Sequence, residues 1–378
     1  MTQTELSSNL AAGDTSSLST ESKALRVRLC ASTDVGRERA HNEDNYLVAD
    51  LGAAERTPEK QTHTFTITER GLLLAVCDGM GGAAAGEVAS QMAVDTLYEC
   101  MRAPQTAPSR EELARHLIQT VEEAGSRIFN QATANRDMRG MGTTVTAAVF
   151  RDENVFLAQV GDSRAYLVRA GVVTQVTRDQ SLVNKLIEAG QLTEEEAESY
   201  EHTNIILQAL GTSDRVEVDL THADIRPGDL LMLCSDGLSG MLKKDGLEAI
   251  LLGDTDPEVL CTKLIAGANA AGGSDNITVI VMSVEQGEPA KKAVVDEQVR
   301  YKKFSLPPPA SAGAMLSIAP PAAAGAVGPT LMITPTYQTP EVEEAIVLPV
   351  EERSPLRPVL IAGGIAALAA FLWFFTRV

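Results

Sequence analysis

The chain has 378 residues, 44% of them hydrophobic, which is enough to bury the core of one large domain or two ordinary ones. Its formal net charge of -19 argues against a general nucleic-acid binder, because an acidic surface repels phosphate backbones. The 5 cysteines are widely spaced and include no CxxC pair, which argues against a disulfide framework and favours a reducing compartment.

The two ends of the chain differ in composition from the middle. Residues 1–24 are rich in Ser and Thr without an apolar core, so we expect a disordered segment and no secretory signal. Residues 287–356 are rich in Pro and Ala, which predicts an extended linker. Residues 359–375 are all apolar or Gly, and such a helix is about 26 Å long, close to the thickness of a bilayer core. We therefore predict a transmembrane helix at 357–377, since a buried core helix is seldom apolar all round.

Residues 25–286 alternate short apolar runs with turn signals, which predicts one folded domain. Four consecutive strands with hairpin-length gaps between them, from 143 to 176, indicate an antiparallel meander. The hydrophilic stretch 52–70 is expected to be only a loop. The predicted strands are Arg26–Ser32, Asn45–Asp50, Leu72–Cys77, Thr143–Phe150, Val155–Val160, Ala165–Arg169, Val172–Val176, Leu230–Cys234 and Ile277–Val284.

Helices are predicted between these strands. One covers Glu87–Met101, and a longer one covers Arg110–Ala134 behind a capping box formed by Ser109 and Glu112. A third, more polar helical region covers Ser181–Tyr200. Strand runs interleaved with helices predict an α+β fold with sheets in the middle and helices outside.

Four aspartates stand where predicted strands begin or end. Asp78 and Asp236 each follow an apolar strand and precede Gly, in LLLAVCDG and LLMLCSDG. Asp162 follows the strand that ends at Val160, and Asp275 precedes the last strand. Any one of them is an ordinary turn residue. Together they would repel one another unless a cation neutralised them, and an oxygen-only donor set without a nearby His favours Mg²⁺ or Mn²⁺ over zinc.

The glycines after Asp78 allow a second interpretation. Gly79, Gly81 and Ala84 match the GxGxxA spacing of a dinucleotide-binding turn. The charge of Asp78 would repel a pyrophosphate there, and Asp95 lies inside a predicted helix rather than at the strand end where a ribose-binding acid belongs. The metal interpretation is favoured.

An arginine lies in the loop STDVGRERAHNEDN, ahead of the second predicted strand. The guanidinium of Arg39 can bind a phosphate monoester through two hydrogen bonds. A surface salt bridge between Arg39 and Glu43 of the same loop explains the presence of this arginine equally well.

Together these residues resemble the metal-dependent Ser/Thr protein phosphatases of the PPM (PP2C-like) family, in their bacterial form. The resemblance covers Leu25–Glu285 and implies a four-layer αββα sandwich, in which two antiparallel sheets are flanked by helices around a centre of two Mn²⁺ or Mg²⁺ ions. It rests on seven blocks in the family's order: TDVGRERAHNEDN, VCDGMGGAAAGEVAS, MGTTVTAAV, VGDSRAYLVRAG, DQSLVNKLIEAGQLTEEEA, LCSDGLSGML and SDNITVIVM.

The resemblance also implies the metal ligands. Asp78 would bridge the two cations, and the carbonyl of Gly79 would bind one of them. Asp236 and Asp275 would complete the other site. Asp162 matches the acid that binds a third, weaker metal.

Further roles follow from the same resemblance. Arg39 matches the phosphate-binding arginine, and Glu43 and Asp44 match acids around the metal-bound waters. Three positions depart from the family pattern: Met80 stands where animal members carry a His proposed as general acid, Gln180 replaces a His, and Gly240 stands where some members have another acid near the third metal. Residues 177–204 resemble the flap beside the cleft, where substrate choice would be set.

The implied reaction is hydrolysis of phosphoserine and phosphothreonine in proteins by a water that bridges the two cations. The alternatives are a catalytically silent phosphopeptide-binding scaffold and a phosphatase dedicated to one regulator of a sigma-factor pathway. We expect phosphorylated proteins, including Ser/Thr kinases and their substrates, as partners, with no nucleic acid and a monomeric catalytic domain. We also expect a single-pass protein of the bacterial inner membrane whose catalytic domain lies in the cytoplasm.

Overall fold

The computed structural model describes residues 25–57, 62–81, 85–103, 109–197, 200, 204–286 and 301–306. All of them belong to the first of two compact units, which spans Met1–Ala312. Within the described residues, no helix is both long and apolar enough to cross a membrane. The predicted segment 1–24, most of the predicted linker 287–356 and the predicted transmembrane helix 357–377 lie outside these residues.

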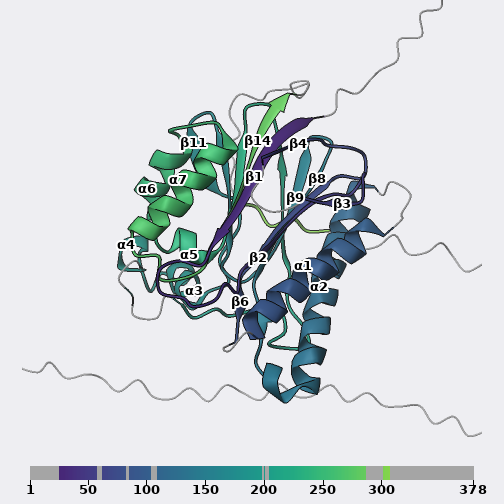
Figure 1. Cartoon of the computed structure of the whole chain (residues 1–378), viewed down its shortest axis with the longest axis vertical. Helices are drawn as coiled ribbons and strands as arrows, with labels where there is room; N and C mark the ends of the chain where they lie inside the picture. Colours follow the sequence, from purple (N-terminus) through teal and green to yellow (C-terminus); the bar gives the residue numbers. More distant parts are fainter. Residues whose placement is uncertain are drawn as a thin grey trace, which may run out of the picture. The chain divides into compact units, whose positions relative to one another are not determined.

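Two antiparallel sheets form the centre of the domain (Figure 1). In the described part of the chain each has six strands, and a separate pair joins β6 (Gly79–Met80) to β7 (Gly142–Thr143). Sheet A has the order β11 (Val172–Gln175), β10 (Arg164–Arg169), β13 (Leu230–Cys234), β14 (Ile277–Gln286), β1 (Arg26–Asp34) and β4 (His63–Thr66). Sheet B has the order β12 (Asp219–Asp224), β9 (Asn154–Val160), β8 (Val145–Arg151), β5 (Leu72–Cys77), β2 (Asn45–Asp50) and β3 (Glu55–Arg56).

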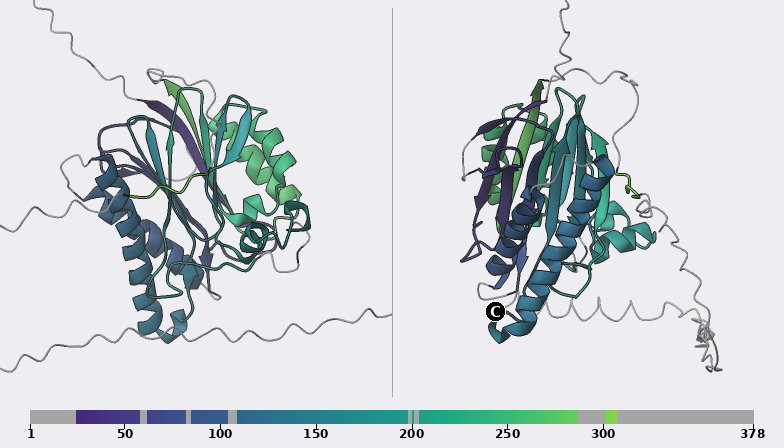
Figure 2. Two further views of the ribbon diagram at one scale, coloured as in Figure 1. Left: turned by 180° about the vertical axis from the view of Figure 1, so that it is seen from behind. Right: turned by 90° about the vertical axis from the view of Figure 1, so that its right-hand side faces the viewer.

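Helices cover the outer faces of both sheets (Figures 1 and 2). Sheet B packs on α1 (Ala85–Arg102) and α2 (Arg110–Ala134), and α2 begins with the predicted capping box. Sheet A packs on α6 (Lys244–Leu251) and α7 (Pro257–Ala270). The shorter helices are η1 (Arg136–Met138), α3 (Leu182–Glu188), α4 (Glu194–Ala197) and α5 (Asp236–Ser239). The predicted arrangement of two antiparallel sheets flanked by helices is therefore confirmed.

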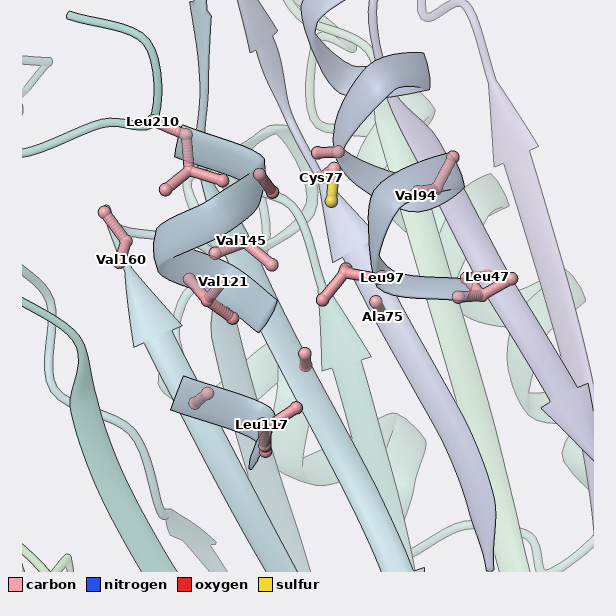
Figure 3. Close-up of a cluster of buried hydrophobic side chains, with 14 of the residues drawn as sticks. Leu47, Ala75, Cys77, Val94, Leu97, Leu117, Val121, Val145, Val160 and Leu210 are labelled. Carbon is pink, nitrogen blue, oxygen red and sulfur yellow. The ribbon is translucent and has the colours of Figure 1, made fainter. Parts of the chain in front are cut away.

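Strand β5 shows why the sequence folds into these layers. It reads LLLAVC and is buried at every position. Side chains alternate along a strand, so Leu72, Leu74 and Val76 pack between the two sheets, whereas Ala75 and Cys77 pack against the helices. Figure 3 shows the cluster on the helix side, where side chains from sheet B meet α1 and α2; it labels Leu47, Ala75, Cys77, Val94, Leu97, Leu117, Val121, Val145, Val160 and Leu210.

The stretch 52–70 is not only a loop, as the sequence suggested. It contains β3, which pairs with β2 at the edge of sheet B, and β4, which pairs with β1 at the edge of sheet A. Both are short and partly polar, and β4 alternates half-buried with exposed residues. Because the apolar signal is so weak, only the neighbouring strands define them.

The predicted meander is also wrong in its connections. Strands β8 and β9 form a hairpin in sheet B, whereas β10 and β11 form a hairpin in sheet A. The turn at residues 161–163 crosses from one sheet to the other, and it contains Asp162. The hairpin gaps indicated local pairing correctly but carried no information on which sheet each hairpin joins.

Candidate active site

The structure brings the predicted acids together at one end of the sandwich. Asp44 precedes β2, Asp78 follows β5, and Asp162 lies in the turn between β9 and β10. Asp236 begins α5 next to β13, and Asp275 precedes β14. The Asp78 carboxyl shares a hydrogen bond with Asp236 and interacts electrostatically with Asp44 and Asp162.

Burial and mutual repulsion raise the pKa values of these carboxyl groups. Burial raises the pKa of Asp44 to about 8, with the charges of Asp236 and Asp275 adding to it. Burial likewise raises the pKa of Asp162 to about 7 and the pKa of Asp78 well above its usual range. The pKa of Asp236 is raised for the same reason. Such a group of acids cannot be fully ionised near neutral pH without added positive charge.

The chemistry of this donor set fits divalent cations. One carboxyl oxygen each of Asp44, Asp162 and Asp236 is buried without a hydrogen-bond partner. Unpartnered carboxyl oxygens in a cluster of acids are the donors that Mg²⁺ and Mn²⁺ prefer. Among the described residues, no group of three or more His, Cys, Asp or Glu is already placed to hold a metal ion, and Asp78 hydrogen-bonds to Asp236 instead.

The glycine after each of the two strand-end aspartates allows another acidic segment to approach closely. A Cβ on Gly79 would lie 2.3 Å from the carbonyl oxygen of Gly86 and 2.5 Å from that of Glu43. A Cβ on Gly237 would lie 2.1 Å from the carbonyl oxygen of Asn276. Both Asp-Gly pairs thus need the missing side chain for backbone packing, which explains the glycines without a nucleotide.

Hydroxyl groups that the sequence analysis did not identify hold two of the acids. The Asp78 N–H donates to Thr144 Oγ1 at 3.0 Å, and Thr143 Oγ1 donates to the Asp78 carbonyl at 2.8 Å. Ser235 Oγ donates to Asp44 Oδ2 at 2.7 Å. These residues lie in the blocks MGTTVTAAV and LCSDG, but nothing in their spacing distinguishes them from other buried hydroxyls.

The N-terminal loop, residues 35–43, is held at the same site by two contacts: Arg39 of the loop binds Asp275, and Asn276 binds the loop backbone. Arg39 Nη2 donates to Asp275 Oδ2 at 2.7 Å, whereas the alternative salt bridge to Glu43 is not formed among the described residues. Asn276 Oδ1 accepts from the Glu43 N–H at 2.8 Å, and its Nδ2 donates to the carbonyl of His41 at 2.9 Å. The buried amide of Asn276 therefore fixes the loop that carries Arg39 and Glu43.

Gln180, which departs from the family pattern, supports the turn that holds Asp162. Its side-chain Oε1 accepts from the Gly161 N–H at 3.0 Å, and its backbone N–H donates to the Gly161 carbonyl at 2.9 Å. The neighbouring Asp179 pairs with Arg164, whose Nη2 lies 2.7 Å from Asp179 Oδ2. The start of the flap is thus tied to the acidic end of the sandwich.

Comparisons with known proteins agree with this geometry. The family model for protein phosphatase 2C matches residues 55–253. The serine/threonine phosphatase stp of Listeria innocua is 38% identical over 250 residues, which cover 66% of this chain and 93% of that protein. The chain belongs to the protein phosphatase 2C family.

Two further relatives extend the match. The serine/threonine protein phosphatase PstP of Mycobacterium tuberculosis is 39% identical over 263 residues, which cover 69% of this chain and 45% of that protein. A crystal structure of the catalytic domain of PstP in complex with 2 manganese ions matches with a TM-score of 0.57 and 35% identity, covering 69% of this chain and 100% of that one. The family predicted from the motifs is confirmed, and the predicted enzyme class, protein serine/threonine phosphatase, is confirmed with it.

Proposed function

We propose that this phosphatase hydrolyses phosphoserine and phosphothreonine in proteins at the acidic end of the sandwich, with two Mn²⁺ or Mg²⁺ ions held by Asp78, Gly79, Asp236 and Asp275. The observation that carries the proposal is the cluster of carboxyl groups with raised pKa values and unpartnered buried oxygens. The two manganese ions in the PstP structure support the choice of metal.

Three further acids complete the proposed site. Asp162 would hold a third, weaker cation, because it lies beside Asp236 and has an unpartnered oxygen. Glu43 and Asp44 would accept hydrogen bonds from the water molecules around the cations. Asp44 lies close enough to Asp78 and Asp236 for electrostatic interaction with both.

When bound, the cations would acidify a water molecule and offset the negative charge of the phosphate oxygens. The protein's own residues would orient the reactants. Arg39 is half-exposed and is held beside the site by Asp275, so its guanidinium can bind two phosphate oxygens in a fixed orientation. Thr144 and Ser235 would keep Asp78 and Asp44 in place.

For its location, we propose a single-pass protein of the bacterial inner membrane with the phosphatase domain in the cytoplasm. The support is the apolar sequence 359–375, with Arg357 before it and Arg377 after it. The linker would let the domain reach phosphorylated membrane proteins, including Ser/Thr kinases, at a high effective concentration. Protease protection in spheroplasts tests the topology, and cleavage of the domain from the outer side would overturn it.

The activity is tested on the full-length protein in detergent, with p-nitrophenyl phosphate and a phosphothreonine peptide as substrates. We expect hydrolysis that depends on Mn²⁺ and falls about a thousandfold or more in Asp236→Asn, because a charge that binds the cations is lost. Asp152→Asn is the matched control, since Asp152 is an exposed turn residue with a φ of 52°, which Asn also adopts. Full activity in excess chelator would refute the proposal. Peptide binding without hydrolysis would support the silent scaffold instead.

A further inference from the structure

Residues 301–306 lie on the phosphatase domain although they belong to the predicted linker (Figure 2, yellow-green in the left view). The Phe304 N–H donates to the carbonyl of Leu220 at 2.6 Å, and Lys303 forms an antiparallel bridge with Thr221. Both partners belong to β12, one of the two edge strands of sheet B in the described part of the chain. The segment therefore pairs with the edge of the sheet through an isolated β-bridge.

The side chain of Phe304 anchors this segment. Its ring lies 5.7 Å from the ring of Phe156 in an edge-to-face arrangement and 5.5 Å from the ring of His222. Together with Leu306 it packs against the cluster between sheet B and helices α1 and α2. Aromatic contacts of this kind add to the free energy of simple apolar burial, so the segment has a specific seat on the domain.

Tyr301, at the start of the segment, contacts the flap. Its hydroxyl donates to Asp219 Oδ2, and the guanidinium of Arg178 hydrogen-bonds to it and lies 6.0 Å from its ring centroid. Arg178 also forms an ion pair with Glu188 at the end of α3. Tyr301 is thereby connected, through Arg178, to the C-terminal end of the first flap helix.

Lys303 is linked to the flap by a second route, through Glu217. Its Nζ lies 2.9 Å from Glu217 Oε1. The carbonyl of Glu217 accepts from Gln180 Nε2 at 3.2 Å, and Gln180 Oε1 accepts from the N–H of Gly161. Gly161 is the residue before Asp162. The segment is therefore linked through two residues, Glu217 and Gln180, to the turn at the acidic end.

We propose that residues 301–306 hold the flap in the position that binds a protein substrate, and that Tyr301 and Lys303 are positioning residues for substrate specificity. The proposal rests on the phosphatase activity proposed above. Directly after the flap, Ile205 and Leu207 are exposed, and they lie two residues apart in a stretch that pairs with flap residues 180–182. They therefore share a face and offer apolar contacts to a protein surface, whereas a small aryl phosphate needs only the acidic end.

The experiment compares the full-length protein with its Phe304→Ala and Tyr301→Phe variants, on a phosphothreonine protein and on p-nitrophenyl phosphate with Mn²⁺. We expect KM for the phosphoprotein to rise about threefold to tenfold, while kcat and KM for p-nitrophenyl phosphate change by less than about twofold. Hydrogen exchange of residues 177–197 should become faster in both variants. Lys302→Ala is the matched control, since Lys302 is exposed and no contact of its side chain is seen within the described residues.

Three outcomes would overturn the proposal: equal losses on both substrates, no change on either, or unchanged exchange in the flap. If Phe304→Ala does not fold, Lys303→Gln together with Tyr301→Phe carries the test. Absence of hydrolysis by the unmodified protein would refute the proposed activity, whereas the exchange measurement would still decide whether the segment orders the flap.

Discussion

The acidic end of the sandwich and the β12 edge are stabilised in opposite ways. At the acidic end, buried carboxyl groups of like charge lie together, so the fold holds them at a cost until cations bind. At the β12 edge, Lys303 and Arg178 face Glu217 and Glu188 in partly exposed ion pairs, each of which contributes little. The first region holds charges together at the expense of stability, whereas the ion pairs of the second contribute little and cost little to break.

The largest expected effect concerns the metal-free acidic end. Asp44 and Asp162 have folded-state pKa values of about 8 and about 7, above the ordinary 3.8, so the fold favours their protonated forms. In chelator, the free energy of unfolding should therefore be highest near pH 4 and fall as the pH rises through about 7 and 8, the folded-state pKa values. Each group contributes up to about 1.4 kcal/mol for every unit by which its pKa is raised.

Urea titrations at several pH values measure this slope. Asp44→Asn should flatten it, and saturating Mn²⁺ should restore stability at pH 8. A metal-free protein that is equally stable at pH 5 and pH 8 would show that the buried carboxyl groups of the acidic end do not lower the stability of the fold.

A smaller effect is expected for backbone packing at the same end. Gly79→Ala should lower the free energy of unfolding by about 1–3 kcal/mol, because a Cβ would collide with the carbonyls of Gly86 and Glu43. Gly246→Ala in α6 is the control, since its Cβ would meet only a side-chain methyl group of Leu242, at 3.9 Å, and alanine favours the helix. Thermal unfolding distinguishes the two, and equal effects would contradict the tight packing inferred for Gly79.

The smallest effect belongs to the β12 edge. Burial lowers the pKa of His222, and the positive charge of Arg110 lowers it further, whereas the negative charge of Asp224 raises it. Because the ring of Phe304 lies 5.5 Å from that of His222, docking adds to this burial and favours the neutral imidazole. Docking should therefore weaken as the pH falls below about 6.5, by less than about 1 kcal/mol.

Fluorine NMR of p-fluorophenylalanine incorporated in place of Phe304 measures the docked fraction between about pH 7.5 and about pH 5.5. In a His222→Gln background the fraction should not change with pH. A pH response that persists in this background would assign the effect to another group.

The sequence predicts the features whose physical cause is local. An apolar run that ends in Asp-Gly marks both a buried strand and a polar residue at its end, so Asp78 and Asp236 could be located together with β5 and β13. Helix α7 was not predicted although Asp256 caps it and Pro257 begins it, because its many small apolar residues give only a weakly amphipathic pattern.

Other features depend on partners far away in the chain. The edge strands β3 and β4 exist only beside β2 and β1. Asn276 matters because residues 35–43 fold over it. The sequence YKKFSL, next to a proline run, has the composition of a linker, and only the exposed edge of β12 gives it a fixed position.

The position of residues 301–306 also affects self-association. An unpaired edge strand is a template for pairing with another chain, and proteins usually cover such edges. In this phosphatase the segment covers part of β12 from the chain's own sequence. A fragment cut after residue 286 would expose that edge to a second copy, so a soluble fragment that remains monomeric at high concentration should extend to residue 306.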